Sequence, residues 1–318
     1  MKIEGGTFLV TGGAGFIPSH LIEMLLDKGA GRVVSFDNFS RGRKENLLEV
    51  LKSEKFDFYE GDLRDTKLLN KIIEGVDAVF HMASMCLSYC QENPLDGFDV
   101  NVNGTFNLIE ACVKNKVKRF VYSSSSSIYG NASYSPMDEE HPLNNENFYG
   151  ASKICGEYML SAFYNKYNIP YVNLRYMNVY GPRQDYMGTY VAVIMNIIDN
   201  IHNGKNPIIH GDGLQKFDFV YVGDACRANI CALESDKCDE SYNISTGIQT
   251  SIIEIAELIM SVMDYSGEVE FFNTDHNVLV TNRIGSTKKA EKELGFEADV
   301  LIRDGLRKTI DWRKVMEV

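Results

Sequence analysis

Residues 7–18, TFLVTGGAGFIP, join a short apolar run to a glycine-rich turn, and a helical pattern follows over Ser19–Lys28. Glycines in such a turn let the backbone approach a pyrophosphate, and the free N–H groups at the start of the helix face the anion. A strand before the turn and a helix after it give the context that a dinucleotide site requires. The turn residues expected to contact the cofactor are Gly12, Gly15, Phe16 and Ile17.

Asp37 follows about twenty residues later, at the end of the second expected strand. A carboxylate there accepts hydrogen bonds from a ribose 2′-hydroxyl and repels a 2′-phosphate, which favours NAD over NADP. Arg41 and Arg43 weaken that preference. Pro18 stands where the fingerprint has its third glycine, and proline is tolerated in the first turn of a helix. We therefore expect a slightly displaced helix and a retained cofactor site.

Short β-rich runs alternate with helical patterns through the first half of the chain. The expected strands are Thr7–Val10, Arg32–Phe36, Asp57–Tyr59, Ala78–His81, Arg119–Ser123 and Tyr171–Leu174. The expected helices are Ser19–Lys28, Thr66–Ile73, Val102–Asn115 and Tyr149–Tyr167. Helices between short apolar strands imply crossover connections and a parallel sheet. The expected fold class is α/β, a doubly wound parallel (Rossmann) sheet with a smaller C-terminal substrate-binding lobe.

The regular alternation of strands and helices ends after about Asn178. The later expected elements are a helix near Thr189–Asn203, a strand over Asp218–Val222, a helix over Ile252–Met263, and a helix within Ser286–Leu294 that starts at a Ser/Thr cap. We assign residues 1–177 with about 217–242 to a cofactor-binding domain. Residues from about 178–216 and 243–318 are assigned to the substrate-binding lobe.

Composition limits the choice of partners and compartment. The formal net charge is −12, which argues against nucleic acid or an anionic membrane as a partner, because both attract clustered cations. A phosphate-bearing substrate would then need a few well-placed basic residues in its site. The start of the chain does not resemble a secretory signal, and the apolar runs are too short to span a membrane. The seven cysteines include no CxxC pair, so we expect a reduced, cytoplasmic protein without a metal site.

Tyr149 and Lys153 lie four residues apart on an expected helix and therefore share one face. A free tyrosine has a pKa of about 10, and a nearby ammonium and a positive nicotinamide would both favour its phenolate. Lowering that pKa by about 3 units requires about 4 kcal/mol.

The run Val121–Gly130, VYSSSSSIYG, ends a strand where open parallel sheets bind ligands. A serine hydroxyl there can hydrogen-bond a reacting alcohol, although a flexible serine-rich turn is the alternative reading.

Together these motifs resemble the extended short-chain dehydrogenase/reductase family, and more narrowly its nucleotide-sugar epimerases and dehydratases. The motifs are, in chain order, TGGAGFI at 11–17, Asp37, Gly61-Asp62-Leu63, His81-Met82-Ala83, Asn101-x-x-Gly104-Thr105, SSSSSIYG at 123–130, Tyr149-x-x-x-Lys153 and RYMNVYGP at 175–182. The resemblance spans about residues 5–312 and implies a tightly bound NAD. It also implies that the C-terminal lobe binds a nucleotide sugar.

The resemblance assigns roles to individual residues. Tyr149 would be the base, Lys153 would hold its pKa and the ribose, and Ser125 would bind the reacting hydroxyl. Asp62 would meet the adenine, and Asn178 would contact the substrate diphosphate. The implied cofactor contacts are Gly12, Gly15, Phe16, Ile17, Asp37, Asn38, Asp62, Leu63, Met82, Ala83, Asn101, Ser123, Tyr149, Lys153, Tyr176 and Val179. The implied substrate contacts are Ser125, Ser126, Asn178, Phe217 and Arg283.

The chain departs from the family pattern at two places. Ser126 and Ser127 stand where the 4,6-dehydratases carry Asp-Glu, so the acid and base of dehydration are missing. Phe217 stands where many relatives place an arginine that grips the substrate phosphates, and Lys216 would lie on the opposite face of a strand. Arg283 matches the family's other phosphate-binding arginine, with a solvated loop cation as the alternative.

These features predict an enzyme that oxidises the C4 hydroxyl of a nucleotide-linked sugar, with Tyr149 as base and NAD as hydride acceptor. The favoured form is a dehydrogenase that releases the 4-keto sugar. An overall resemblance to enzymes that modify GDP-linked manno-heptoses or hexoses for bacterial capsule sugars implies a GDP-linked heptose or hexose as the substrate. The first alternative is a C4 epimerase that returns the hydride to the other face. A 4,6-dehydratase and a non-catalytic protein that binds NAD or nucleotide sugar are less favoured. Relatives imply a homodimer or dimer of dimers through the helices at Val102–Asn115 and Tyr149–Tyr167.

Overall fold

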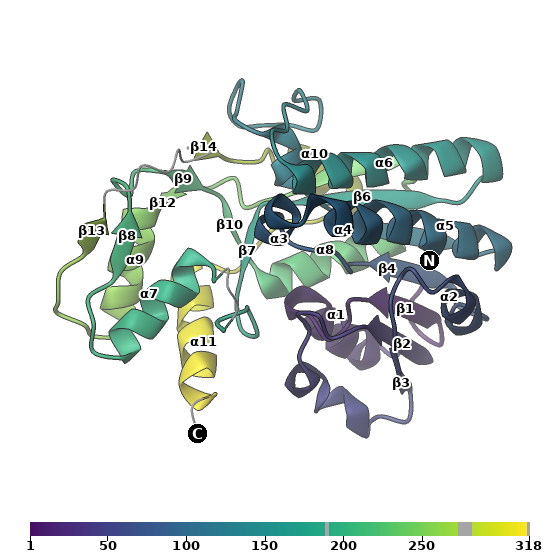
Figure 1. Cartoon of the computed structure of the whole chain (residues 1–318), viewed down its shortest axis with the longest axis horizontal. Helices are drawn as coiled ribbons and strands as arrows, with labels where there is room; N and C mark the ends of the chain where they lie inside the picture. Colours follow the sequence, from purple (N-terminus) through teal and green to yellow (C-terminus); the bar gives the residue numbers. More distant parts are fainter. Residues whose placement is uncertain (188–190, 273–281, 317–318) are drawn as a thin grey trace.

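A seven-stranded sheet lies at the centre of the computed structural model, which describes residues 1–187, 191–272 and 282–316 (Figure 1). Its strands are, from edge to edge, β3 (Phe56–Glu60), β2 (Arg32–Asp37), β1 (Thr7–Thr11), β4 (Ala78–His81), β5 (Arg119–Ser125), β6 (Tyr171–Tyr176) and β11 (Glu240–Ile244). All neighbouring strands pair in parallel. The chain order reverses between β1 and β4, which is where doubly wound sheets bind ligands. The expected fold class is confirmed.

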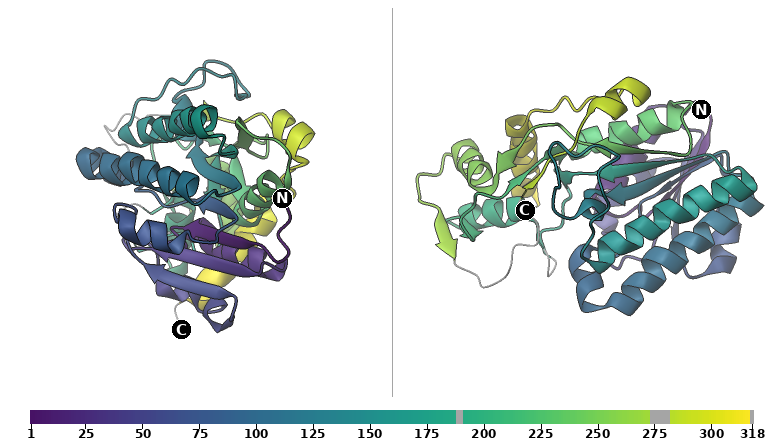
Figure 2. Two further views of the ribbon diagram at one scale, coloured as in Figure 1. Left: turned by 90° about the vertical axis from the view of Figure 1, so that its right-hand side faces the viewer. Right: turned by 90° about the horizontal axis from the view of Figure 1, so that it is seen from above.

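Helices cover both faces of this sheet (Figure 2). The helices α1 (Phe16–Asp27), α8 (Val222–Glu234) and α10 (Lys288–Leu294) share a core with one face, and α2 (Thr66–Ile72), α5 (Thr105–Lys114) and α6 (Phe148–Tyr167) share a core with the other. Side chains alternate along β1, because Phe8 and Val10 enter the first core and Leu9 enters the second. Burial on both faces explains why the strands read as nearly continuous apolar runs.

The segment between β4 and α5 is more elaborate than the sequence pattern predicts. It contains α3 (Leu87–Glu92), α4 (Pro94–Phe98) and a π-helical stretch over Asp99–Gly104 that runs into α5. The expected helix Val102–Asn115 is therefore regular α-helix only over Thr105–Lys114. Single 3₁₀ turns cover Lys44–Leu47, Val50–Lys52 and Ser126–Tyr129.

A second, smaller core lies beside the carboxyl edge of the sheet, on the left in Figure 1. Its described elements are β7 (Asn178–Tyr180), α7 (Val193–His202), β8 (Ile208–His210), β9 (Lys216–Phe217), β10 (Phe219–Tyr221), β12 (Thr250–Ser251), α9 (Ile252–Val262), β13 (Glu270–Phe272), β14 (Asn282–Arg283) and α11 (Ile302–Val315). Ile198, Ile255 and Leu306 bring α7, α9 and α11 together in this core. The expected domain limits remain a prediction.

Several expected boundaries in the second half differ from the structure. The strand expected over Asp218–Val222 is limited to Phe219–Tyr221, because Val222 begins α8. The helix expected near Thr189–Asn203 is α7, and Thr189 lies outside the described residues. Thr287 is the N-cap of α10, but its side chain makes no capping hydrogen bond. In the described part of the chain, no helix combines the length and apolar character needed to cross a membrane.

Candidate active site

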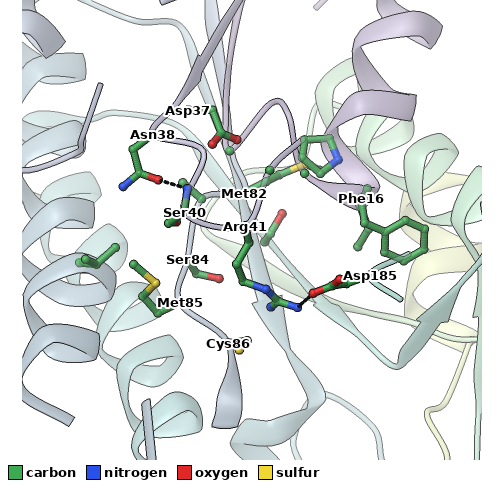
Figure 3. A pocket seen from close by; sticks show the side chains of 18 of the residues that line it. Phe16, Asp37, Asn38, Ser40, Arg41, Met82, Ser84, Met85, Cys86 and Asp185 are labelled. Carbon is green, nitrogen blue, oxygen red and sulfur yellow. Dashed lines mark hydrogen bonds and ion pairs between the residues drawn. The ribbon is translucent and has the colours of Figure 1, made fainter. Parts of the chain in front are cut away.

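A cavity of about 390 Å³ opens at the carboxyl ends of the central strands, where the strand order reverses (Figure 3). Its lining includes many residues that the sequence assigns to the cofactor: Gly12, Gly15, Phe16, Ile17, Asp37, Asn38, Asp62, Leu63, Met82, Ala83, Ser123, Tyr149, Lys153 and Tyr176. The motifs converge because the ends of parallel strands meet at one edge of the sheet. Their position makes this cavity the candidate site.

The glycine-rich turn has the close-packed backbone that a pyrophosphate cradle needs. Gly12 has a φ of +70°, and a Cβ on it would lie 2.9 Å from the Cα of Ala83. A Cβ on Gly15 would lie 2.9 Å from the carbonyl oxygen of Gly12. Pro18 lies in the first turn of α1 and lines the cavity, so it removes no N–H that the helix needs. A Cβ at Gly12 or Gly15 would collide with neighbouring backbone, so both positions need glycine, and this tight turn fits the phosphates of NAD.

Asp37 fixes the end of β2 at the ribose side of the cavity. Its carboxylate accepts hydrogen bonds from the backbone N–H of Ala14 at 3.0 Å and of Phe39 at 2.7 Å. Burial raises the pKa of Asp37, and the two backbone donors partly offset this effect. The carboxylate is thus held in one orientation where a ribose hydroxyl can donate to it.

Replacing Asp37 with asparagine is expected to increase the affinity for NADP relative to NAD by roughly 10–100-fold. The amide keeps an acceptor oxygen for Ala14 but carries no charge to repel a 2′-phosphate, and Arg41 and Arg43 line the same cavity. Titration of both cofactors into the apoprotein measures the ratio. Asp57→Asn, which alters an ion pair with Arg32 on the neighbouring strand, is the matched control. An unchanged ratio would contradict the assigned role of Asp37.

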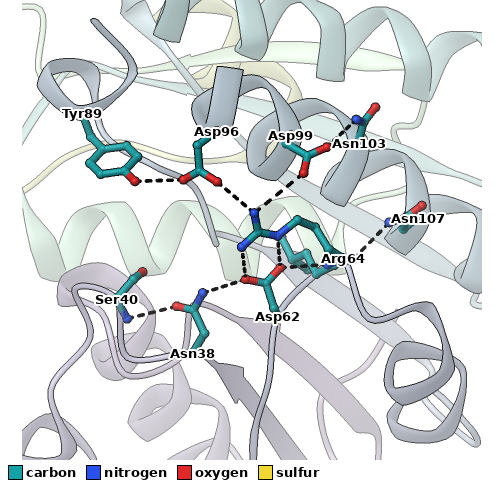
Figure 4. A network of polar contacts seen from close by, with 10 residues as sticks. Asn38, Ser40, Asp62, Arg64, Tyr89, Asp96, Asp99, Asn103 and Asn107 are labelled. Carbon is teal, nitrogen blue, oxygen red and sulfur yellow. Dashed lines mark hydrogen bonds and ion pairs between the residues drawn. The ribbon is translucent and has the colours of Figure 1, made fainter. Parts of the chain in front are cut away.

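A polar network holds Asp62 at the end of β3 (Figure 4). Its carboxylate accepts hydrogen bonds from Arg64 Nε at 2.8 Å and from Asn38 Nδ2 at 3.0 Å. Arg64 also donates to Asp96 at 2.9 Å, and Asp96 accepts from the hydroxyl of Tyr89. The hydrogen bonds from Arg64 lower the pKa of Asp62 to about 2. Asp62 therefore stays ionised and oriented, and the network joins this end of the cavity to α3 and α4.

Tyr149 and Lys153 share the inner face of α6, as their spacing predicts. The helix is capped by Asn147, whose side-chain oxygen accepts from the backbone N–H of Gly150 at 2.7 Å. The ammonium of Lys153 donates to the carbonyl oxygen of Ser123 at 2.8 Å and lies 5.6 Å from the centre of the Tyr149 ring. Burial lowers the pKa of Lys153 to about 8, so this group remains mostly protonated at neutral pH.

The phenol of Tyr149 is less acidic in the chain alone than the sequence argument supposes. Burial raises its pKa to about 12, and hydrogen bonds with the hydroxyls of Ser125 and Ser84 act in the opposite direction. The expected lowering is not seen, because desolvation of the phenolate is the largest effect on this pKa. Ser84, on the loop after β4, was not anticipated from the sequence.

Asn101 and Val179 do not line the described cavity, although the sequence assigns them to the cofactor. Asn101 is buried and supports the loop after β4. Its amide oxygen accepts from the backbone N–H of Met85 at 2.7 Å, and its amide nitrogen donates to Met85 O and to Ser152 Oγ, each at 3.1 Å. It therefore holds this loop against α6, close to the reacting groups. Val179 lies in β7, paired with Val220.

The residues assigned to the substrate lie around the end of β5 and in the small sheets. Ser125 Oγ accepts from the backbone N–H of Ser127 at 3.1 Å. Arg283 is 8% exposed rather than solvated, and its Nη1 lies 3.5 Å from Ser126 Oγ. Phe217 pairs with Arg283 across β9 and β14. Asn178, in β7, donates its backbone N–H to Asp218 O at 2.9 Å.

Basic side chains gather at the cavity although the whole chain carries a net charge of −12. Those that line it are Arg41, Arg43, Lys153 and Arg183. Arg41 and Arg43 pair with Asp185, and Arg183 pairs with Glu23, so a phosphate-bearing ligand would meet cations that are already partly balanced by carboxylates. Arg183 and Asp185 were missed from the sequence, because no motif or periodic pattern marks the segment that follows Pro182.

Comparisons with known proteins agree with this geometry. Residues 8–245 match the model of the NAD dependent epimerase/dehydratase family. A putative UDP-glucose 4-epimerase from Methanocaldococcus jannaschii is 38% identical over 96% of this chain and 98% of its own length. The structure of UDP-glucose 4-epimerase from Thermotoga maritima with UDP-glucose has a TM-score of 0.92 and 32% identity, covering 98% of this chain and 100% of that one. The structure of UDP-N-acetylglucosamine 4-epimerase from Methanobrevibacter ruminantium, in complex with UDP-N-acetylmuramic acid, has a TM-score of 0.93 and 33% identity. It covers 99% of this chain and 100% of that one. The chain belongs to the NAD-dependent epimerase/dehydratase family.

Proposed function

We propose that this protein is a C4 epimerase of a UDP-linked sugar. The observation that carries the proposal is the set of groups around Tyr149: Lys153 and the hydroxyls of Ser84 and Ser125. Among the described residues, the carboxylates that line the cavity are Asp37, Asp62 and Asp185. Asp37 ends β2, Asp62 lies two residues after β3 and is paired with Arg64, and Asp185 is paired with arginines. The reacting groups thus suit the transfer of one proton and one hydride at a single carbon.

Three residues of this chain have separate roles in the proposed reaction. Tyr149 takes the proton of the C4 hydroxyl, Ser125 hydrogen-bonds that hydroxyl, and Lys153 stabilises the phenolate. When bound, NAD would accept the hydride from C4 and return it, and its positive ring would favour the phenolate of Tyr149. After the keto sugar has turned its other face towards the cofactor, the hydride would return to that face of C4, and Tyr149 gives the proton back to the C4 oxygen.

The relatives support this alternative better than the dehydrogenase favoured from the sequence. Two of the relatives described above are 4-epimerases of UDP sugars that the chain matches almost end to end, and neither acts on a GDP-linked heptose or hexose by its name. Dehydratases occur in the same family, but Ser126 and Ser127 offer hydroxyls where elimination needs an acid and a base. An epimerase needs neither group.

The substrate contacts and the assembly belong to the same proposal. Ser126, Asn178, Phe217 and Arg283 remain the proposed contacts of the nucleotide sugar, within a lobe built from about 178–216 and 243–318. A homodimer, or a dimer of dimers, through α5 and α6 is also proposed. These helices lie side by side (Figure 2), and they expose the rings of Phe106 on α5 and of Tyr158 and Tyr167 on α6.

A direct assay tests the proposed reaction. Purified protein is mixed with UDP-glucose, UDP-N-acetylglucosamine and a GDP-hexose, the absorbance of NADH is followed, and products are separated by chromatography and mass. The expected result is a product of unchanged mass from a UDP sugar, with no lasting NADH. Persistent NADH with a product lighter by two hydrogens would instead establish the dehydrogenase.

A further inference from the structure

The segment 182–187 runs along the cavity and is tied to the loop after β2. The carboxylate of Asp185 bridges two arginines of that loop, with Oδ2 3.1 Å from Arg41 Nη2 and Oδ1 3.2 Å from Arg43 Nη2. Both arginines and Asp185 line the cavity that holds the glycine-rich turn. Figure 3 shows the Arg41–Asp185 pair between Phe16 on one side and Ser84 on the other. The ion pair therefore joins the loop after β2 to the segment 182–187 at the lining of the cavity.

Further contacts anchor the same segment to α1. Arg183 donates to Glu23 at 2.5 Å and also lines the cavity. The carbonyl oxygen of Pro182 lies 2.9 Å from His20 Nε2, which must carry the proton because the carbonyl can only accept. Burial lowers the pKa of His20 to about 4, so this neutral hydrogen bond persists at physiological pH. The start of the segment is therefore held against α1 independently of Asp185.

Tyr186 extends the attachment to the C-terminal helix. Its ring centre lies 4.4 Å from the guanidinium carbon of Arg43 and 4.2 Å from that of Arg313 on α11. Trp312 packs edge-on against the same ring at 5.8 Å. A cation above an aromatic ring is attracted to it. Tyr186 is therefore held both by Arg43 of the loop after β2 and by Arg313 of α11. The segment consequently links the cofactor loop, α1 and α11.

We infer that residues 182–187 form a cofactor strap that retains NAD throughout the catalytic cycle, with Asp185 as the positioning residue that closes it. The inference rests on the proposed function, because an epimerase must hold its reduced cofactor until the hydride is returned. A net dehydrogenase must exchange the cofactor after each turnover, and a closed strap would slow it. A dinucleotide lying in the crevice can leave only after the bonds of Asp185 to Arg41 and Arg43 have opened.

The same arginines suggest one competing arrangement. Arg41 and Arg43 would then bind a phosphate of the cofactor directly, and Asp185 would compete with that phosphate for them. The two arrangements predict opposite effects of removing the carboxylate. Loss of Asp185 speeds the release of NAD from a strap, whereas it slows release if the arginines are phosphate ligands.

The test measures cofactor release from the holoenzyme without any substrate. Wild type and Asp185→Asn are loaded with deuterium-labelled NAD and mixed with excess unlabelled NAD, and the label retained on the protein is followed by mass spectrometry. We expect release from Asp185→Asn to be roughly tenfold faster, since two partly exposed ion pairs are lost. High salt should speed release from wild type and have less effect on the variant. Asp57→Asn, at the exposed pair with Arg32, is the control and should match wild type.

Unchanged or slower release from Asp185→Asn would overturn the strap, and slower release would identify Arg41 and Arg43 as phosphate ligands. The exchange assay needs no turnover, so its result stands even if the chain proves not to be an epimerase. The epimerase assay, in turn, decides the proposed reaction whatever the release rate. If the strap and the epimerase reaction are both correct, diluted Asp185→Asn should lose epimerase activity with time and recover it when NAD is added. Diluted wild type should keep its activity without added NAD.

Discussion

Replacing Tyr149 with phenylalanine is expected to lower kcat by about 10²–10⁴-fold, the usual contribution of a positioned acid–base group. Phenylalanine keeps the ring that packs against the cluster of Met85, Cys90 and Val100, so folding and NAD binding should be preserved. What is lost is the oxygen that Ser125 and Ser84 contact. Initial rates of product formation, with the NAD content of the purified variant, measure the effect.

Tyr158→Phe is the matched control, because Tyr158 lies on the same helix and is 66% exposed. It should retain wild-type activity. A Tyr149→Phe variant with full biological activity would instead support a non-catalytic protein that binds NAD and nucleotide sugar.

The pH profile adds a second readout for Tyr149. Activity of the wild type should rise with pH, because the phenol must lose its proton, until Lys153, with a pKa of about 8, loses the charge that stabilises the phenolate.

The first half of the fold was predictable because its signals are local. Each of the six expected strands lies within a central strand of the sheet or differs from it by a residue or two at its ends, as Thr7–Val10 does from β1. Buried parallel strands are short apolar runs between turns, and burial on both faces makes them stand out. The glycines and Asp37 then follow from the strand ends.

The second half was less predictable because its elements are short or carry little apolar contrast. β10 has three residues, and its apolar run continues into Val222, the first residue of α8, which the pattern therefore assigns to the end of the strand. The helix α11 is rich in charges, and Leu306, Thr309 and Ile310 are its inward residues. Few of its residues are apolar, so the helix lacks the apolar content by which the others stand out, although Leu306 and Ile310 keep helical spacing.

The candidate site likewise contains residues that could be predicted from the sequence and residues that could not. Residues in motifs, such as Tyr149 and Lys153, are brought together by the sheet edge, so their meeting could be predicted. Asp185 contacts Arg41 across 144 residues of chain, and no spacing rule reports such a contact. The pKa of Tyr149 was expected to fall from its spacing to Lys153, but burial raises it in the chain alone, and burial is a property of the folded structure.

Stability should depend most strongly on the buried ion pair between Arg175 on β6 and Glu157 on α6. Their side chains are 8% and 9% exposed, and the guanidinium donates to both carboxylate oxygens, at 2.7 and 3.0 Å. Glu157 also accepts from Ser124 Oγ. Arg175→Met would leave this buried carboxylate without its bidentate partner, so we expect a loss of about 3–5 kcal/mol in the free energy of unfolding. Urea unfolding of the NAD-loaded protein measures it.

A double variant separates the cost of the stranded charge from the value of the pair. Replacing both Arg175 and Glu157 with methionine removes the two charges together, and buried pairs replaced by apolar groups often lose little stability. The recovery should be incomplete here, because Arg175 also donates to Tyr129 Oη and Glu139 O, which the double variant leaves without that donor. If the double variant is as unstable as Arg175→Met, these hydrogen bonds, rather than the unpaired carboxylate, carry the stability. Glu49→Gln, at a pair with both side chains at least 70% exposed, should shift the urea midpoint little.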